Sequence, residues 1–196
     1  MNQTHKIKGP YEAVFKRLID VVASSLVIIL FFWLYLILAL IVRIQLGSPV
    51  IFTQDRPGKN GKVFKLYKFR SMSDKRDENG ELLPDKMRLN KFGRILRSTS
   101  LDELPELFNI IKGDMSVVGP RPILYSQMEE CNAYEKQRLI VKPGLTCYWQ
   151  VCGRARIKWD RWVELDLQYI QDMSILKDLE LIFRTFPAIF GKDGAY

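Results

Sequence analysis

The stretch VVASSLVIILFFWLYLILALIV, from Val21 to Val42, carries no charge along its whole length. As a straight helix it would measure about 33 Å, close to the hydrocarbon core of a bilayer at about 30 Å. It is too long and too apolar for the surface helix of a soluble domain. It also lacks the short apolar region and small-residue cleavage site of a signal peptide. The stretch therefore predicts a helix that stays in the mature protein and inserts into a membrane.

The basic residues gather on both sides of this stretch. The sequence has 30 Lys and Arg against 22 Asp and Glu, a formal net charge of +8. Residues 1–20 carry +2 and residues 43–72 carry +6, so that residues 73–196 are neutral. A nucleic-acid-binding domain usually spreads its basic excess over a folded face, whereas this excess surrounds an apolar helix. The distribution favours a membrane protein that contacts lipid and no nucleic acid.

Two topologies are open for the apolar stretch. Cytoplasmic flanks attract Lys and Arg, so basic residues on both sides favour a re-entrant helix that returns to the face it entered. A re-entrant helix needs a break, yet the sequence has neither Pro nor Gly from Val21 to Leu46, which favours a full crossing. The flanking charge and the missing breaker therefore disagree, and both topologies stay open on these residues alone. An interfacial helix over Tyr11–Asp20 would lead into the apolar stretch.

The rest of the chain is predicted to form an α/β domain, mainly helical with a short β-hairpin. Gly47-Ser48-Pro49 ends the apolar helix, so residues 1–46 form the membrane part and residues 47–196 a single compact cytoplasmic domain. The expected segments are hairpin strands over Val50–Gln54 and Lys62–Met72, a polar loop over Ser73–Gly80, helices over Asp85–Arg97, 101–113 and Ser126–Val141, and an aromatic-rich end over Trp159–Phe190.

An acidic pair, Asp102-Glu103, stands at the start of a predicted helix. The apolar face of that helix would be Leu101, Leu104, Phe108 and Ile111, which puts the carboxylates on the opposite side. Ser100 with Glu103 three residues later resembles a capping box, and local pattern alone favours that structural role. The alternative is functional, because carboxylates beside the free amides of a helix start can help to bind phosphate or a metal.

Several cations stand near this pair in the sequence or on neighbouring loops. Arg97 lies just upstream, Arg121 is held between two prolines, and Lys68 and Arg70 end the hairpin. An arginine fork matches phosphate oxygens, and a Pro-Arg-Pro loop would fix it with little loss of entropy. Taken singly, each cation is more often a solvated charge. P-loop, Rossmann and zincin patterns are all absent, and the three cysteines suggest neither a disulfide framework nor a zinc site.

Taken together, these residues resemble the bacterial sugar transferase family, in its small monotopic form of polyprenyl-phosphate phosphoglycosyl transferases. The resemblance covers nearly the whole chain, from about Tyr11 to Phe183. Its most specific part runs from Arg97 to Pro122. The matching motifs are YEAVFKRLID, GSPVIFTQDRPG, KLYKFRSM, LRSTSLDELPELFNIIKGDMSVVGPRP and KPGLT.

The resemblance implies a reaction. The family transfers a sugar-1-phosphate from a UDP-sugar to polyprenyl (undecaprenyl) phosphate, releases UMP and uses Mg²⁺, at the cytoplasmic face of the bacterial inner membrane. The product would enter a glycan pathway with downstream glycosyltransferases. By the resemblance, Asp102 is the nucleophile that forms a phospho-aspartyl sugar intermediate, Asp102 and Glu103 hold Mg²⁺, and Glu103 can also serve proton transfer. The implied substrate contacts are Lys68, Arg97, Arg121 and Asp166.

The chain departs from the family pattern at two places. The family's membrane helix usually carries a Ser-Pro break, and the matching position here is Phe32-Trp33. The flanking charge and the family habit together predict the re-entrant form, against the missing breaker. After Pro-Gly the family reads like ITGWAQVNGR, whereas this chain has LTCYWQVCGR over Leu145–Arg154. Cys147, Trp149 and Cys152 therefore bear on recognition of the nucleotide or the sugar rather than on the chemical step.

Two other function classes compete with the enzyme. One is an inactive membrane-anchored scaffold that binds polyprenyl phosphate or partner glycosyltransferases, and it predicts binding without turnover. The other is a peripheral binder of anionic lipid or nucleic acid that uses the basic segment from Arg43 to Met72, and its binding would collapse with salt and ignore UDP-sugars. The acidic pair with its cations favours the enzyme.

Overall fold

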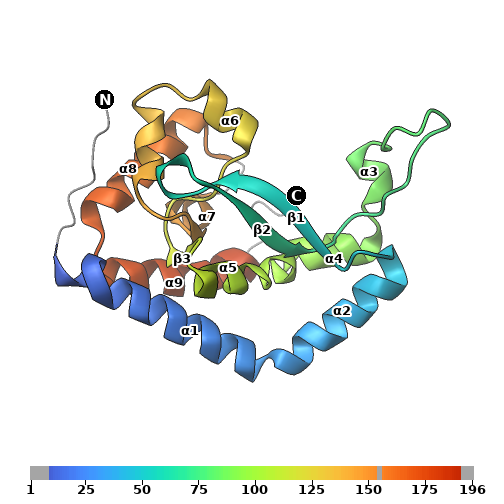
Figure 1. Cartoon of the computed structure of the whole chain (residues 1–196), viewed down its shortest axis with the longest axis horizontal. Coiled ribbons are helices and arrows are strands. Elements are labelled where there is room, and N and C mark those ends of the chain that lie inside the picture. Colours follow the sequence, from blue (N-terminus) through green and yellow to red (C-terminus); the bar gives the residue numbers. More distant parts are fainter. Residues whose placement is uncertain (1–8, 154–155, 191–196) are drawn as a thin grey trace.

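A computed structural model of the chain describes residues 9–153 and 156–190. These residues form mainly helices, with two small two-stranded sheets, as the α/β prediction expects (Figure 1). The α-helices are α1 (Lys16–Leu30), α2 (Phe32–Leu46), α3 (Asp85–Arg88), α4 (Lys91–Ser98), α5 (Glu106–Lys112), α6 (Tyr125–Glu130), α7 (Tyr148–Cys152), α8 (Trp159–Asp172) and α9 (Ile175–Phe190). The strands are β1 (Ile51–Pro57), β2 (Val63–Phe69), β3 (Ser116–Val118) and β4 (Gly144–Thr146). A π-helical turn covers Tyr11–Phe15, and 3₁₀ turns cover Lys59–Gly61, Leu101–Glu103 and Glu135–Ile140.

The apolar stretch is bent. The segments Tyr11–Leu30 and Phe32–Leu46 meet at 66°; together they have the length and composition of a broken membrane helix, while no single helix in the described part of the chain does. The chain leaves helical geometry at Phe31 (φ −105°, ψ 18°), without Pro or Gly. Next to this break the Tyr35 hydroxyl donates to the Leu104 carbonyl at 2.8 Å. We attribute the bend to such tertiary contacts, since no breaker residue is present.

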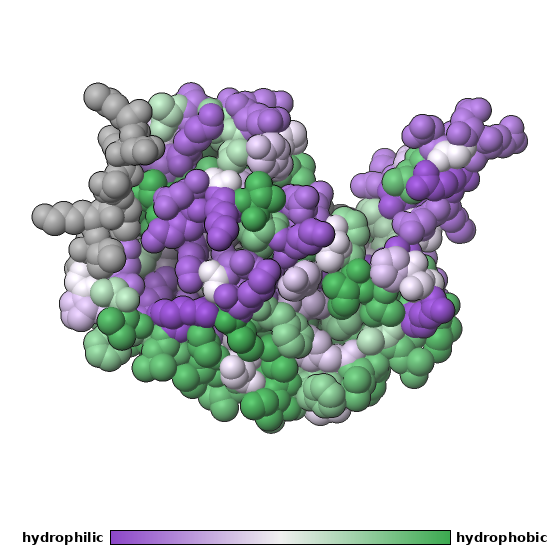
Figure 2. Space-filling view, in the orientation of Figure 1, coloured by the Kyte–Doolittle hydropathy of each residue, from purple (hydrophilic) through white to green (hydrophobic). Residues whose placement is uncertain are grey.

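Large apolar side chains are exposed along one edge of the molecule. In Figure 2 the lower edge, formed by α1 and α2, is hydrophobic, and hydrophilic residues lie above it. Exposed fractions reach 74% at Ile29 and 57% at Trp33. The residues of this apolar edge are Leu18, Ile19, Val22, Leu26, Ile29, Leu30, Phe31, Phe32, Trp33, Leu36, Ile37, Leu40 and Ile44. A contiguous surface of this kind marks an interaction site.

Polar side chains attach the other face of α1 to the body of the protein. The Arg17 guanidinium donates to the carbonyls of Ile110 (2.5 Å) and Ile111 (2.7 Å), at the end of α5 where backbone carbonyls lack helical partners. Asp20 accepts from the Val117 amide at 2.9 Å. The helix is therefore amphipathic in an uncommon way, with its polar face buried and its apolar face exposed.

The β-hairpin is confirmed, in an antiparallel register that pairs Ile51 with Phe69 and Pro57 with Val63. β1 is longer than predicted because it continues to Pro57. Phe64 and Leu66 are buried on one face of β2, where they pack with Leu107 and Ile110 of α5 and with Met115. This contact brings the hairpin against the segment that carries the acidic pair.

A second, parallel sheet was not predicted, and it joins the two Pro/Gly-rich loops. β3 pairs with β4 through Ser116 with Gly144 and Val118 with Thr146. The Gly144 amide donates to Pro120 at 2.9 Å. A Cβ atom on Gly144 would lie 2.0 Å from the Gly119 amide nitrogen, so only glycine allows this approach. The sheet thus fixes the loop that carries Arg121.

Two of the helix predictions need correction here, and the aromatic-rich end gains a structure. The helix expected over Ser126–Val141 is split into α6 and the 3₁₀ turn Glu135–Ile140, and Asp85–Arg97 is split into α3 and α4. Cys131 and Leu89, which follow α6 and α3, have extended backbone conformations that end those helices. The segment Trp159–Phe190 forms two helices, α8 and α9, which pack with β3 and α7 around a core that includes Val118, Tyr148, Val163 and Leu181.

Candidate active site

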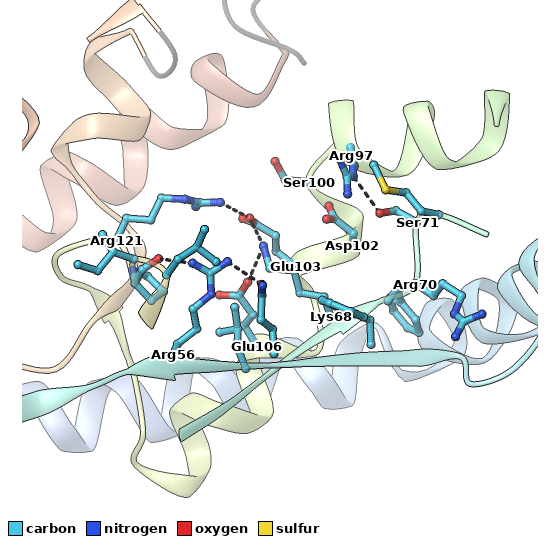
Figure 3. Close-up of a pocket in the computed structure, with 18 of the residues that line it drawn as sticks. Arg56, Lys68, Arg70, Ser71, Arg97, Ser100, Asp102, Glu103, Glu106 and Arg121 are labelled. Carbon is cyan, nitrogen blue, oxygen red and sulfur yellow. Dashed lines mark hydrogen bonds and ion pairs between the residues drawn. The ribbon is translucent and has the colours of Figure 1, made fainter. Parts of the chain in front are cut away.

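A cavity of about 620 Å³ lies against one face of the hairpin (Figure 3). Side chains alternate along a strand, so Lys68 projects from the same face of β2 as Phe64 and Leu66. The opposite side is lined by the 3₁₀ turn Leu101–Glu103 and the start of α5. Arg121 and residues of α7 and α8 line one end, and Arg97 and Ser71 lie toward the other.

The acidic pair lies in this cavity, but on a 3₁₀ turn rather than in an α-helix. Ser100 precedes it in the left-handed conformation (φ 56°, ψ 17°) and its side chain makes no capping hydrogen bond, so the capping-box interpretation is wrong. Asp102 and Glu103 are only 8% and 9% exposed. α5 begins at Glu106, directly after Pro105, which has no N–H to donate.

The predicted apolar face of this helix is wrong in part, since Leu101 and Leu104 pack against the core but Phe108 does not. Phe108 is 46% exposed, whereas Leu107 and Ile110 are in the core. The tighter 3₁₀ turn changes the angular position of the pair relative to α5. As a result both carboxylates face a buried polar cavity and not solvent.

Glu103 is fixed by two cations. Its Oε1 accepts from Lys68 Nζ at 2.8 Å and from Arg121 Nη2 at 2.6 Å. Burial opposes ionisation of Glu103, but Arg121 and Lys68 outweigh it and hold the pKa of this carboxyl well below its usual range. Burial also disfavours charge on Arg121, yet Glu103 raises the pKa of that guanidinium. Glu103 is therefore ionised at any physiological pH.

Asp102 has the opposite setting. No hydrogen-bond donor reaches its carboxylate among residues 9–153 and 156–190, and it lies on the Arg97 side of Glu103 (Figure 3). Burial, and next the charge of Glu103, raise the pKa of Asp102 to about 6, while Lys68, Arg97 and Arg121 act against that rise. Asp102 is thus an ionised, unpaired and poorly solvated carboxylate at neutral pH.

Arg97 is positioned by the loop after the hairpin. Its Nε donates to Ser71 Oγ at 2.9 Å. The Asn90 side chain caps α4 by accepting from the Gly93 amide at 2.7 Å. A Cβ atom on Gly93 would lie 2.0 Å from the Ser71 carbonyl oxygen, so helix and loop are in direct contact. Arg97 consequently extends into the cavity from a fixed base.

Sequence reasoning missed several polar residues of the cavity, among them Glu106, Gln54 and Arg56. Glu106 is 3% exposed and shares Lys68 with Glu103, at 3.1 Å. Burial, opposed by Lys68, raises the pKa of Glu106 to about 7. Gln54 and Arg56 of β1 pair with Leu66 and Phe64 in the register, and so share the face of Lys68. The alternation of side chains along β1 could have identified both Gln54 and Arg56 from the sequence.

The structure does not bring Asp166 to the cavity. This residue is 1% exposed on α8, where its carboxylate forms an ion pair with Arg138, and it is not among the lining residues. Burial, opposed by Arg138, raises the pKa of Asp166 to about 7. In this structure Asp166 thus forms a buried ion pair and does not line the cavity, where a substrate contact was predicted. Arg138 in turn donates to the Arg121 carbonyl at 3.1 Å.

An aromatic wall closes the Arg121 end. Trp149 and Trp162 stack with ring centroids 4.9 Å apart, and the Arg121 guanidinium lies over Trp149 at 5.4 Å. Of the three departures noted in the sequence, Trp149 lines the cavity, while Cys147 and Cys152 do not. Cys147 is buried, and burial raises the pKa of its thiol to about 12, so it stays a neutral thiol.

The donor set fits a magnesium ion that is held jointly with a phosphate ligand. No group of three or more His, Cys, Asp or Glu with metal-binding geometry occurs in the described residues. Mg²⁺ is commonly bound through one or two carboxylates together with substrate phosphates and water. Asp102 offers such a carboxylate, since no described residue hydrogen-bonds to it.

Comparisons with known proteins find a matching family model and several similar proteins. The family model for "Bacterial sugar transferase" matches residues 11–192. The chain is 42% identical to the "Uncharacterized sugar transferase EpsL" of Bacillus subtilis (92% of this chain, 90% of that protein). It is 42% identical to a "UDP-glucose:undecaprenyl-phosphate glucose-1-phosphate transferase" of Klebsiella pneumoniae, over 93% of this chain and 42% of the other. It is 37% identical to an "Undecaprenyl-phosphate galactose phosphotransferase" of Salmonella typhimurium, over 92% of this chain and 41% of the other. The chain thus spans nearly all of the first relative and about two-fifths of the other two.

Proposed function

This chain belongs to the bacterial sugar transferase family, and from that premise we propose that it transfers a sugar-1-phosphate from a UDP-sugar to polyprenyl phosphate. The observation that carries the proposal is the Asp102 carboxylate. It is ionised at neutral pH, lacks a hydrogen-bond donor among the described residues and is accompanied by three cations. A carboxylate with a raised pKa that remains charged is a stronger nucleophile than an ordinary one.

The first step of the proposed reaction forms a covalent intermediate. A carboxylate oxygen of Asp102 attacks the phosphorus that carries the sugar. The bond from that phosphorus to the bridging oxygen breaks, and UMP leaves with the bonding electron pair. The product is a phospho-aspartyl sugar.

The cations make this attack feasible, because a carboxylate and a phosphate repel each other. Arg97 and Arg121 lie on the two sides of the acidic pair and Lys68 lies beneath it (Figure 3). Arginine forks suit phosphate oxygens, and positioning with charge compensation accounts for most of the catalysis in phosphoryl transfer.

The second step regenerates the enzyme. An oxygen of polyprenyl phosphate attacks the same phosphorus, and Asp102 leaves as a free carboxylate. The new diphosphate bond joins the sugar phosphate to the lipid. Because nucleophile and leaving group are both anions at neutral pH, neither step requires a proton donor.

Mg²⁺ would be held by Asp102 and Glu103 together with phosphate oxygens, and it would neutralise phosphate charge. Glu103 would contribute an oxygen without leaving Lys68 and Arg121, because both of these donors contact Oε1.

We place the protein at the bacterial inner membrane, with its catalytic domain on the cytoplasmic face. The exposed apolar edge of α1 and α2 and the 66° bend support re-entrant insertion of these helices into the bilayer. Arg43 near the end of α2 and the basic hairpin beyond it would then face anionic lipid. A lipid phosphate acceptor requires an active site close to the membrane surface.

A UMP-release assay tests the function. Purified protein with Mg²⁺ and undecaprenyl phosphate would be given a panel that includes UDP-glucose and UDP-galactose. We expect UMP from at least one donor and, without acceptor, radiolabelled sugar phosphate bound to the protein and released by hydroxylamine. Asp102→Asn should lose both signals, whereas Asp172→Asn, at an exposed position on α8, should keep them. Full activity of Asp102→Asn would refute the nucleophile, and donor binding without turnover would favour the scaffold.

A further inference from the structure

We propose that Arg138 is a positioning residue that holds Arg121 in place against Glu103. The inference rests on the proposed transferase function and adds to it a residue outside the cavity. Arg138 lies in the 3₁₀ turn Glu135–Ile140 and is 2% exposed. Its Nη2 group donates both to the carboxylate of Asp166 and to the backbone carbonyl of Arg121.

The contact to the Arg121 carbonyl matters because of the loop in which it lies. Pro120 and Pro122 flank Arg121, so their φ angles are fixed and they offer no N–H group. Fixing the carbonyl between them leaves few ways for this residue to turn. On the other side of the same residue the guanidinium reaches Glu103 at 2.6 Å. A continuous series of polar contacts therefore leads from Asp166 through Arg138 and Arg121 to Glu103.

A second route leads through aromatic rings. The Arg138 guanidinium lies over both Trp159 and Trp162, at 5.2 and 4.9 Å from the ring centroids. Trp162 stacks on Trp149, and Trp149 lies under the Arg121 guanidinium. Arg138 thus contacts the backbone of Arg121 directly and is linked to its side chain through Trp162 and Trp149.

Two roles for this buried pair predict different results. A buried ion pair adds little net stability, and replacing both partners by apolar residues of similar size is often tolerated. If Arg138 and Asp166 serve packing alone, such a replacement should fold and remain active. If they position Arg121, the replacement should fold and lose activity, and the loss should depend on the presence of Arg121.

A double-mutant cycle separates these roles. The cycle combines Arg138→Met/Asp166→Leu with Arg121→Met and measures kcat for UMP release and the affinity for UMP by calorimetry. We expect the apolar pair to lower kcat and UMP affinity by about tenfold or more, and to change either by less than about twofold once Arg121 is absent. The matched control is Arg161→Met/Glu164→Leu, which removes an exposed ion pair of 2.8 Å on α8 and should leave both quantities unchanged.

Equal losses with and without Arg121, or parent-like kcat in the apolar pair, would overturn the proposal. If the apolar pair does not fold, Arg138→Lys takes its place in the cycle, because lysine keeps a charge for Asp166 but has no planar guanidinium to lie over Trp159 and Trp162. If both proteins unfold, Arg138 is structural and the proposal is wrong. If the parent binds UMP but turns over no donor, the proposed function fails, while the cycle in UMP affinity still tests the role of Arg138.

Discussion

At the scale of single residues, Asp102 and Glu103 are adjacent in the chain but differ in their partners. Glu103 receives two short hydrogen bonds from cations, whereas Asp102 receives none from the described residues. Burial and the neighbouring charge of Glu103 raise the pKa of Asp102, while direct contact with Arg121 and Lys68 lowers that of Glu103. Widely separated pKa values in one pair assign separate tasks to its members.

The first prediction concerns the pH dependence of catalysis. The proposed nucleophile acts only when ionised, so kcat/KM, which reports the groups of the free enzyme, should rise with pH and reach half its maximum near pH 6. Arg97 lowers the pKa of Asp102, and therefore Arg97→Gln should move this midpoint to higher pH. Arg94→Gln, at an exposed position of the same helix, is the control and should not move it. An unchanged midpoint in Arg97→Gln would show that Arg97 does not act on Asp102.

The second prediction concerns Glu106 and stability. Its pKa is raised to about 7 in the folded protein from the ordinary 4.5, so folding favours the protonated form. The parent should therefore lose stability as pH rises from about 5 to 8, and Glu106→Gln, which cannot titrate, should lose less. We expect a difference of about 1 to 3 kcal/mol in the free energy of unfolding across this range, measured with urea. Parallel pH profiles would contradict the raised pKa.

At the scale of elements, the parallel pair β3 and β4 is small but decides the position of Arg121. It clamps the loops after Val118 and before Gly144 so closely that Gly119 and Gly144 are in backbone contact. The hairpin likewise fixes the position of Lys68, because its strand β2 packs on α5. Each of the two elements thus supplies one of the cations that fix Glu103.

The third prediction tests this clamp. In Gly144→Ala a methyl group would collide with the backbone of Gly119, so the strands must separate. We expect a loss of about 2 kcal/mol or more, a lower Tm by roughly 4 to 8 °C, and reduced turnover because Arg121 moves. The control is Gly80→Ala, at a loop position where the new methyl meets no neighbouring atom and only the backbone conformation is strained. Equal changes in Tm for the two variants would argue against the clamp.

At the scale of the whole molecule, the apolar edge and the cavity are linked through α1 and α2. Arg17 and Asp20 attach α1 to α5 and to β3, and Tyr35 of α2 bonds to Leu104, next to the acidic pair. If a membrane binds the apolar edge, these contacts fix the distance between the bilayer and the cavity. The apolar edge and the cavity are therefore joined by direct contacts.

The fourth prediction concerns membrane binding by the apolar edge. Ile29→Ser/Trp33→Ser removes two exposed apolar side chains from the edge and should weaken binding to vesicles of phosphatidylethanolamine and phosphatidylglycerol by about tenfold or more, measured by flotation. The control is Leu82→Ser/Met87→Ser, at exposed apolar positions away from α1 and α2, and should float like the parent. If the two variants float equally well, the membrane-binding surface lies outside the apolar edge.

Topology is tested separately. A cysteine introduced within the first ten residues should stay unlabelled by a membrane-impermeant reagent in intact cells if the helix is re-entrant. Labelling from outside would instead show a full crossing.

The sequence by itself determined the family, the hairpin, the acidic pair and three of its cations. These are local features: an uncharged run, strand alternation and a long contiguous motif from Arg97 to Pro122. They can be predicted from the sequence because they depend on the spacing of residues along the chain.

Only the tertiary structure decided the bend at Phe31, the burial of the pair, the place of Asp166 and the contacts of Glu106 and Arg138. The bend has no breaker residue and depends on contacts of α2 with distant segments. Asp166 and Arg138 are 28 residues apart, and Lys68 and Glu103 are 35 apart. Whether such charges meet, and whether water is excluded around them, depends on packing, and packing sets the pKa values that distinguish Asp102 from Glu103.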